Sequence, residues 1–170
     1  MASTFARLRR RHETLNRIYR TPPEQRSWWW RLALKFMIGQ FQATVRRRYL
    51  ASIPVAVRLS PTVVFGHDFN GIHLSHEAKL GERVTIMQFV TIGEHHRTKE
   101  APIIGDDVFI GPNACIIGKC EIGNGARIGP GVVLVNATVP PGSLIVNKAA
   151  YDLTNDRWVS DRAAIPTDQA

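Results

Sequence analysis

Hydrophobic positions recur every six residues along the central part of the chain. A Leu or Ile marks this period from residue 74 to residue 134, with one slot missing. These aliphatic positions are Leu74, Leu80, Ile86, Ile92, Ile104, Ile110, Ile116, Ile122, Ile128 and Leu134. A small or β-branched residue follows four positions after each of them except Ile92: Ala78, Val84, Val90, Val108, Ala114, Cys120, Ala126, Val132 and Thr138. A period of six fits neither an α-helix, which needs 3.6, nor a simple strand, which needs 2.

A parallel β-helix accounts for this period, because each hexapeptide forms one short strand and one corner, and three make a triangular coil. The aliphatic residue should point inward and stack on its equivalent one coil away. The small residue should lie inside near the corner. Asn-Gly at 124–125 and Pro-Gly at 130–131 suit tight corners. The pattern therefore predicts an all-β solenoid of about four or five coils.

One slot departs from the repeat. The segment between Ile92 and Ile104 spans two hexapeptide lengths, and Thr98 replaces the aliphatic residue midway. The phase is kept, so the segment is either a modified coil or an excursion that returns in register. It carries adjacent histidines, His95 and His96, and histidine is the residue type best suited to proton transfer near neutral pH.

A helix is expected before the repeat, starting near Ser27 after two prolines. Its apolar residues roughly share one face: Trp30, Leu34, Met37, Ile38, Phe41, Val45 and Leu50. The interpretation we favour is a helix that docks on the β-helix end or on a neighbouring subunit. The alternative is peripheral membrane contact through residues 27–50, because tryptophan with Lys and Arg suits the lipid headgroup boundary.

The chain divides into a basic front and a mildly acidic body. Residues 1–60 carry 13 Lys/Arg and 2 Asp/Glu, whereas residues 61–170 carry 9 and 12. The front should meet a negative partner such as phosphate, anionic lipid or an acidic surface. Basic charge without a recognised binding module is weak evidence for nucleic acid, so no nucleic-acid partner is expected.

The expected organisation has three parts. Residues 1–50 form a basic, mainly helical N-terminal extension, residues 51–147 form the β-helix, and residues 148–170 form a C-terminal tail. The N-terminus lacks an apolar signal-peptide core, and no apolar run approaches the length of a membrane span. We therefore expect a cytoplasmic protein, with the inner face of the membrane as the site of any peripheral contact.

The repeat resembles the left-handed β-helix acyltransferases. The stretches GHDFNGIHLSHEAKLGERVTIMQFVTIGE and IGDDVFIGPNACIIGKCEIGNGARIGPGVVL are similar to the serine acetyltransferase branch, especially its short members found with sugar and polysaccharide genes. The resemblance covers about residues 50–147. It implies a left-handed coil, a homotrimer, acetyl-CoA as co-substrate and no metal.

The resemblance points to His67, in VVFGHDFNGI, as the catalytic base. Acetyl transfer from a thioester to a hydroxyl needs a base and stabilisation of the tetrahedral oxyanion. Long members of the family orient this histidine with an upstream aspartate, and Ser52 occupies that place here. Asp68, directly after His67, is an alternative partner, so the orienting group stays open.

The Arg-His-Pro unit of serine acetyltransferases is absent. When the sequences are aligned on Pro102, Ala101 stands where the family has its second histidine. The nearest substitutes lie further back in the same loop. We expect His96 to act as the second catalytic histidine, with His95 and Arg97 binding the acceptor. Two alternatives stay open: His95 fills the place instead of His96, or these residues are only a solvated loop.

For acetyl-CoA, the resemblance implies a groove between the coils of neighbouring subunits, where corner backbone groups contact the pantetheine arm. The matching positions are Gly111, Pro112, Ala114, Ala126, Gly129 and Pro130. The Gly-Val-Pro unit that usually ends the family's helix is lost. Lys119 and Lys148 could approach a CoA phosphate. Cys115 and Cys120 are expected to be reduced, packed residues.

The leading hypothesis is an acetyl-CoA-dependent O-acetyltransferase acting by direct transfer on a hydroxyl of a sugar or polysaccharide precursor. The missing Arg-His-Pro unit, the short N-terminal part and the basic tryptophan helix favour that acceptor. Serine O-acetylation is the first alternative. The second is a non-catalytic β-helix, or one that binds zinc through His67, His95 and His96 between subunits.

Overall fold

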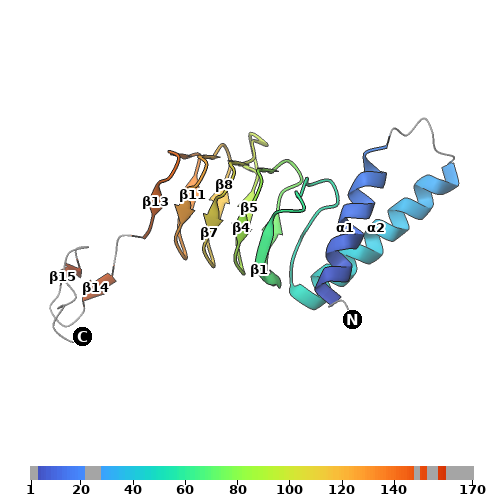
Figure 1. Ribbon diagram of the computed structural model, residues 1–170, viewed down its shortest axis with the longest axis horizontal. Coiled ribbons are helices and arrows are strands. Elements are labelled where there is room, and N and C mark those ends of the chain that lie inside the picture. Colours follow the sequence, from blue (N-terminus) through green and yellow to red (C-terminus); the bar gives the residue numbers. More distant parts are fainter. Residues whose placement is uncertain (1–3, 22–27, 148–149, 153–156, 160–170) are drawn as a thin grey trace.

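The computed structural model describes residues 4–21, 28–147, 150–152 and 157–159. Helices α1 (Thr4–Tyr19) and α2 (Trp28–Tyr49) stand at one end of a stack of short strands (Figure 1). The stacked strands are β1 (Val64–Phe69), β2 (His73–Leu74), β3 (Lys79–Leu80), β4 (Thr85–Ile86), β5 (Thr91–Gly93), β6 (Ile103–Ile104), β7 (Phe109–Ile110), β8 (Cys115–Ile117), β9 (Glu121–Ile122), β10 (Arg127–Ile128), β11 (Val133–Val135), β12 (Thr138–Val139) and β13 (Leu144–Ile145). An antiparallel ribbon of β14 (Ala150–Asp152) and β15 (Arg157–Val159) follows.

The stacked strands form three parallel sheets, which are the three faces of a prism. The first face is β1-β4-β7-β10-β13, the second is β2-β5-β8-β11, and the third is β3-β6-β9-β12. Consecutive strands lie on successive faces, so the chain turns a corner after each strand. We call these the first corner (first to second face), the second corner (second to third) and the third corner (third to first). The predicted left-handed parallel β-helix is confirmed.

The core of the prism is a column of the aliphatic residues that the period identifies. Ile86, Ile92, Ile110, Ile116 and Ile128 are all fully buried. Burying one such side chain contributes about 1.5–3 kcal/mol. Their outward neighbours in the strands are polar or half-exposed, so the alternation along each short strand holds the register.

Coil length varies, and the variations mark particular corners. In a regular coil, paired strands lie three hexapeptide lengths apart along the chain, as His73 and Thr91 do, and four of the ten parallel pairings of the described strands have this spacing. Thr91 pairs with Cys115, a full four hexapeptide lengths later, so the segment with the two histidines is an excursion that returns in register. The first coil is also long, because the pairing of Val64 with Thr85 spans half a hexapeptide more than a regular coil.

The last coil is one residue short, and this corrects the expected position of Thr138. Thr138 pairs with Glu121 on the outer surface of the third face, and Val139 takes the buried position. Asn136, with a φ of 49°, turns the preceding corner in fewer residues. The regular period therefore stops at this corner, and the inward small position falls on Ala137 instead.

Helix α2 docks on α1 and on the first strand of the β-helix. Leu34, Phe41, Val45 and Tyr49 are buried, as the docking interpretation expects. Two residues assigned to the same face are not part of the contact. Trp30 is 44% exposed, and Leu50 follows the helix with a φ of 51° and is 72% exposed. The expected cap at Ser27 lies outside the described residues, and the helix begins at Trp28.

Helix α1 covers the open end of the β-helix with polar side chains. The Asn16 amide donates to the carbonyls of Val55 and Val57, and His12 Nε2 lies 3.1 Å from the Pro54 carbonyl. These carbonyls belong to the turn segment before β1, which would otherwise present unpaired groups. The His12 ring is buried, and this burial lowers its pKa. The two helices therefore form a cap on the solenoid.

Candidate active site

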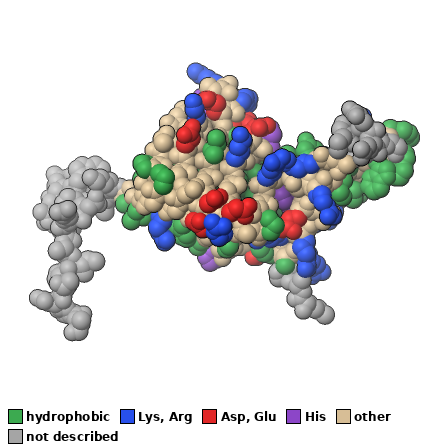
Figure 2. Space-filling view, turned by 45° about the horizontal axis from the view of Figure 1, so that its top comes forward, with side chains coloured by type: hydrophobic (Ala, Val, Ile, Leu, Met, Phe, Trp, Pro, Cys, Tyr) green, Lys and Arg blue, Asp and Glu red, His purple; other side chains and the backbone are tan. Residues whose placement is uncertain are grey.

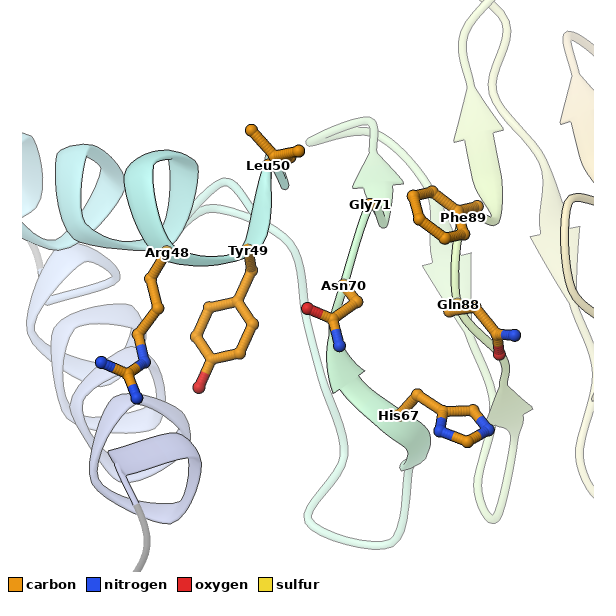
Figure 3. Close-up of a pocket in the computed structure, with 8 residues that line it drawn as sticks. All are labelled: Arg48, Tyr49, Leu50, His67, Asn70, Gly71, Gln88 and Phe89. Carbon is orange, nitrogen blue, oxygen red and sulfur yellow. The ribbon is translucent and has the colours of Figure 1, made fainter.

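A hollow of about 270 Å³ opens at the first corner of the first coil. Its lining comes from the end of α2, from β1 and the corner after it, and from the equivalent corner one coil on: Arg48, Tyr49, Leu50, His67, Asn70, Gly71, Gln88 and Phe89. Figure 3 shows Arg48 and Tyr49 on one side and His67, Gln88 and Phe89 on the other, with Asn70 between them.

The extra residues of the first coil build this corner. Phe65 points inward, and the next inward residue of the period, Leu74, comes half a hexapeptide later than the regular spacing would place it. Between them Asp68 adopts a φ of 53°, and Phe69 turns its ring into the core. His67 therefore stands on a bulge that a regular hexapeptide corner would not contain.

The imidazole of His67 is exposed on this bulge and faces the hollow. Within the described chain, its ring has no hydrogen bond to Asp68 or to Ser52. Ser52 instead pairs with His73 and lines a separate depression on the second face. Within one chain, therefore, neither Asp68 nor Ser52 orients the His67 ring through a hydrogen bond.

Gln88 is a lining residue that sequence reasoning missed. Its Oε1 atom is buried and has no hydrogen-bond partner among the described residues. Leaving such an acceptor unpaired costs about 1–3 kcal/mol, and a ligand in the hollow can donate to this buried atom only if the Gln88 side chain moves. One signal was available: Gln88 follows Asn70 by one regular coil and is the second polar residue at the same corner.

Arg48 and Tyr49 were also missed, because nothing in the repeat predicts that the helix end meets the first corner. The N–H of Gly71 donates to the Tyr49 carbonyl over 2.7 Å, and the Tyr49 ring packs edge-on against Phe69. Arg48 makes no ion pair with any residue in the described ranges. The lining of the hollow therefore includes the positive charge of Arg48, and none of its lining residues is an Asp or Glu.

The His95–His96 pair lies at the second corner, so a single chain does not bring it into this hollow. The excursion closes on itself, because His95 N–H donates to the Glu100 carbonyl and Lys99 N–H donates to the His95 carbonyl. The two imidazole centroids are 5.1 Å apart. His96 and Arg97 are exposed, whereas His95 is half-buried.

Most of the cofactor positions expected from the sequence share the first corner with His67. Gly111, Pro112 and Ala114 lie there two coils beyond His67, and Gly129 and Pro130 one coil further. Backbone hydrogen bonds link these corners in a column: Phe89 N–H to Asn70 O, Asn113 N–H to Gln88 O, and Gly131 N–H to Pro112 O. At about 4.8 Å per coil, the column extends about 14 Å from the His67 corner.

The other cofactor positions lie elsewhere. Lys119 is exposed at the second corner, and Ala126 is fully buried at the third. The Ala126 side chain therefore cannot touch a ligand, although its corner backbone can. Lys148 lies outside the described residues.

Neither the two cysteines nor the zinc site considered from the sequence forms a further site among the described residues of one chain. Cys115 and Cys120 are unpaired thiols, and burial raises the pKa of Cys115, which disfavours its nucleophilic thiolate. The described residues contain no group of three or more His, Cys, Asp or Glu placed to hold a metal ion.

Comparisons with known proteins agree with this architecture. Residues 101–136 match the family model "Bacterial transferase hexapeptide (six repeats)". Serine acetyltransferase of Mycobacterium tuberculosis is 36% identical over 49% of this chain and 37% of its own length. Serine acetyltransferase of Salmonella typhimurium is 31% identical over 67% of this chain and 42% of its own length. The chain thus spans less than half of each of these relatives.

Among solved structures, serine acetyltransferase of Neisseria gonorrhoeae in complex with serine is similar to this chain. Its TM-score is 0.66 at 30% identity, over 82% of this chain and 53% of that one. The structural similarity extends beyond the repeat, because the aligned 82% of this chain is a larger share than the β-helix alone occupies.

Proposed function

Since this chain belongs to the left-handed β-helix acyltransferases with hexapeptide repeats, we propose that it is an acetyl-CoA-dependent O-acetyltransferase. One observation carries the proposal. An exposed histidine, His67, faces a hollow at the start of the corner column that holds most of the positions expected to contact acetyl-CoA.

In this proposal the chemistry is a direct transfer. The acceptor hydroxyl enters the hollow, and His67 removes its proton as the oxygen attacks the thioester carbon. The tetrahedral oxyanion collapses, the C–S bond breaks, and CoA leaves as a thiol after taking back a proton. Backbone N–H groups at the corners are the available oxyanion donors. No covalent enzyme intermediate is needed.

A homotrimer would complete the site. The first corner of one subunit would face the second corner of its neighbour, which carries His95, His96 and Arg97. We propose that His96 serves as a second catalytic histidine and that His95 and Arg97 contact the acceptor across this boundary. Sedimentation velocity of the purified chain tests the assembly, and a monomer that transfers acetyl groups at full rate would contradict it.

The acceptor best supported is serine. The relatives named above are serine acetyltransferases, and this favours serine over the sugar hydroxyl expected from the sequence. Arg48 and Gln88 offer the matching chemistry, a cation for a carboxylate and an acceptor for an ammonium group. Ala101, in place of the family's histidine, keeps a sugar hydroxyl as the second candidate.

A thiol-release assay with acetyl-CoA, run against serine and a panel of free, phosphorylated and nucleotide-linked sugars, tests the function. We expect CoA release that depends on one acceptor class. Release with serine alone supports the first candidate, and release with sugars alone supports the second. Stoichiometric zinc in the purified protein together with no CoA binding would refute the transferase.

A further inference from the structure

Helix α2 has a second apolar face that points away from the rest of the protein. The face consists of Trp28, Trp29, Leu32 and Phe36, with exposed fractions of 73%, 54%, 56% and 68%. Figure 2 shows hydrophobic side chains gathered at the helical end of the molecule. We call these four residues the outer face of α2.

The outer face is distinct from the face that docks on α1. Successive helical residues are rotated by about 100°, so these four side chains fall within a sector of about 100°. Leu34, Phe41 and Val45 lie on the opposite side and are buried. The docking predicted from the sequence therefore accounts for one face only, and leaves the aromatic residues of the helix start uncovered.

The charges beside the outer face are positive. Helix α2 contains no Asp or Glu, and Arg31 and Lys35 are exposed along the edge of the outer face. Neither forms an ion pair with a residue of the described ranges. Arg46 and Arg47 continue the positive charge along the same helix. An acidic protein partner would suit the charge alone, whereas tryptophan, phenylalanine and leucine flanked by cations match the boundary between lipid headgroups and acyl chains.

The geometry also suits a flat surface. The start of α2 lies at the end of the molecule opposite β13 (Figure 1), so a planar partner can reach it without meeting the stacked coils. None of the helices among the described residues is sufficiently long and apolar to cross a bilayer. The contact would therefore be peripheral.

We propose that the outer face of α2 binds the surface of an anionic lipid membrane, with Trp28, Trp29, Leu32 and Phe36 entering the interfacial layer and Arg31 and Lys35 contacting lipid phosphates. This membrane binding is independent of the proposed acetyl transfer, because no residue of the outer face lines the hollow of His67.

The test is co-sedimentation of the full chain with phosphatidylcholine vesicles, with and without phosphatidylglycerol. We expect binding to the anionic vesicles, weakening as salt rises, and a blue shift of tryptophan emission, because three of the four tryptophans belong to this helix start. Trp29→Ser/Phe36→Ser should lower the vesicle partition coefficient by at least about tenfold. Arg31→Gln/Lys35→Gln should weaken binding to the anionic vesicles only.

Val133→Ser/Val135→Ser is the matched control, because both residues are exposed apolar side chains on β11. It should bind vesicles as the unchanged chain does, and circular dichroism should show that all variants fold. Equal vesicle binding by Trp29→Ser/Phe36→Ser, or no binding by the unchanged chain, would overturn the proposal. So would a lower sedimentation coefficient of that variant without lipid, which would assign the outer face to a second copy of the chain.

Discussion

The ring of Phe89 lies directly on the backbone of Gly71, where a Cβ atom would be 2.1 Å from Phe89 Cδ1. Gly71 also has a φ of 64° and donates its N–H to the Tyr49 carbonyl. This one contact joins the helical cap, the His67 bulge and the next coil, and it forms the back of the hollow.

Gly71→Ala should therefore cost more than backbone strain alone. Gly125→Ala is the matched control, because Gly125 has a φ of 69° and nothing within 4 Å of its Cβ position. We expect about 1 kcal/mol of destabilisation for the control and about 2–4 kcal/mol for Gly71→Ala, measured by urea unfolding. Equal losses in the two variants would show that Phe89 moves aside without cost.

His67→Ala should lower kcat for acetyl transfer by about a hundredfold or more, since a positioned base contributes about 10²–10⁴-fold. Its exposed ring should leave the unfolding free energy nearly unchanged. His76→Ala, an exposed histidine at the second corner, is the control and should retain full activity. Steady-state kinetics with saturating acetyl-CoA measure both, and an active His67→Ala enzyme would remove this residue from the mechanism.

Arg48→Gln should raise KM for an anionic acceptor while KM for acetyl-CoA stays constant. A hydrogen bond to a charged group contributes about 1.5–3 kcal/mol, which corresponds to roughly ten- to hundredfold in affinity. Arg47→Gln changes the neighbouring exposed arginine, which does not line the hollow, and should have little effect. If the two variants behave alike, the hollow does not bind the acceptor's charge.

Deleting residues 95–100 should leave a folded β-helix, because it removes one hexapeptide length and restores the regular coil. We expect the thermal midpoint to change little and acetyl transfer to fall by at least about a hundredfold, because both excursion histidines are lost. Deleting only residues 96–99 leaves two extra residues at this corner and should lower the midpoint more than the longer deletion does. Retained activity in the longer deletion would exclude the excursion from the site.

The free energy of unfolding should fall as the pH drops from about 6.5 toward 5, a range in which most carboxylates do not yet titrate. Burial lowers the pKa of His12, so the unfolded chain binds a proton in this range and the folded chain does not. His12→Gln can still donate to the Pro54 carbonyl and should flatten this part of the profile. Urea midpoints across the pH range measure the effect, and an unchanged slope in His12→Gln would assign the loss to other groups.

The repeat could be predicted closely because its period arises from local alternation and corner geometry. Ile86 and Ile110 are buried because each occupies the same slot in its coil, and no distant contact is needed to place them. Thr138 was misplaced because the loss of a single residue at a corner shifts every later slot. From Leu134 onward the glycine that follows most aliphatic positions is absent, so the sequence no longer indicates where a residue has been lost.

The candidate site was only partly predictable for a related reason. His67 was found by resemblance, and its bulge is readable as a phase break, since the polar Asp68 stands one hexapeptide before Leu74, where the period calls for an aliphatic residue. Arg48 reaches the hollow through the angle at which α2 meets the first coil. That angle depends on packing between Tyr49 and Phe69, which are well separated along the chain and share no sequence pattern.

The position of the bulge in the first coil separates two properties of the protein. In the proposed reaction, the residues that would distinguish acceptors belong to the cap and the first two coils, whereas the corner column continues through every later coil. Adding or removing one regular coil between β7 and β10 would therefore change the length of the corner column and leave the hollow of His67 untouched. Acceptor preference and donor length can thus diverge independently in descendants of this sequence.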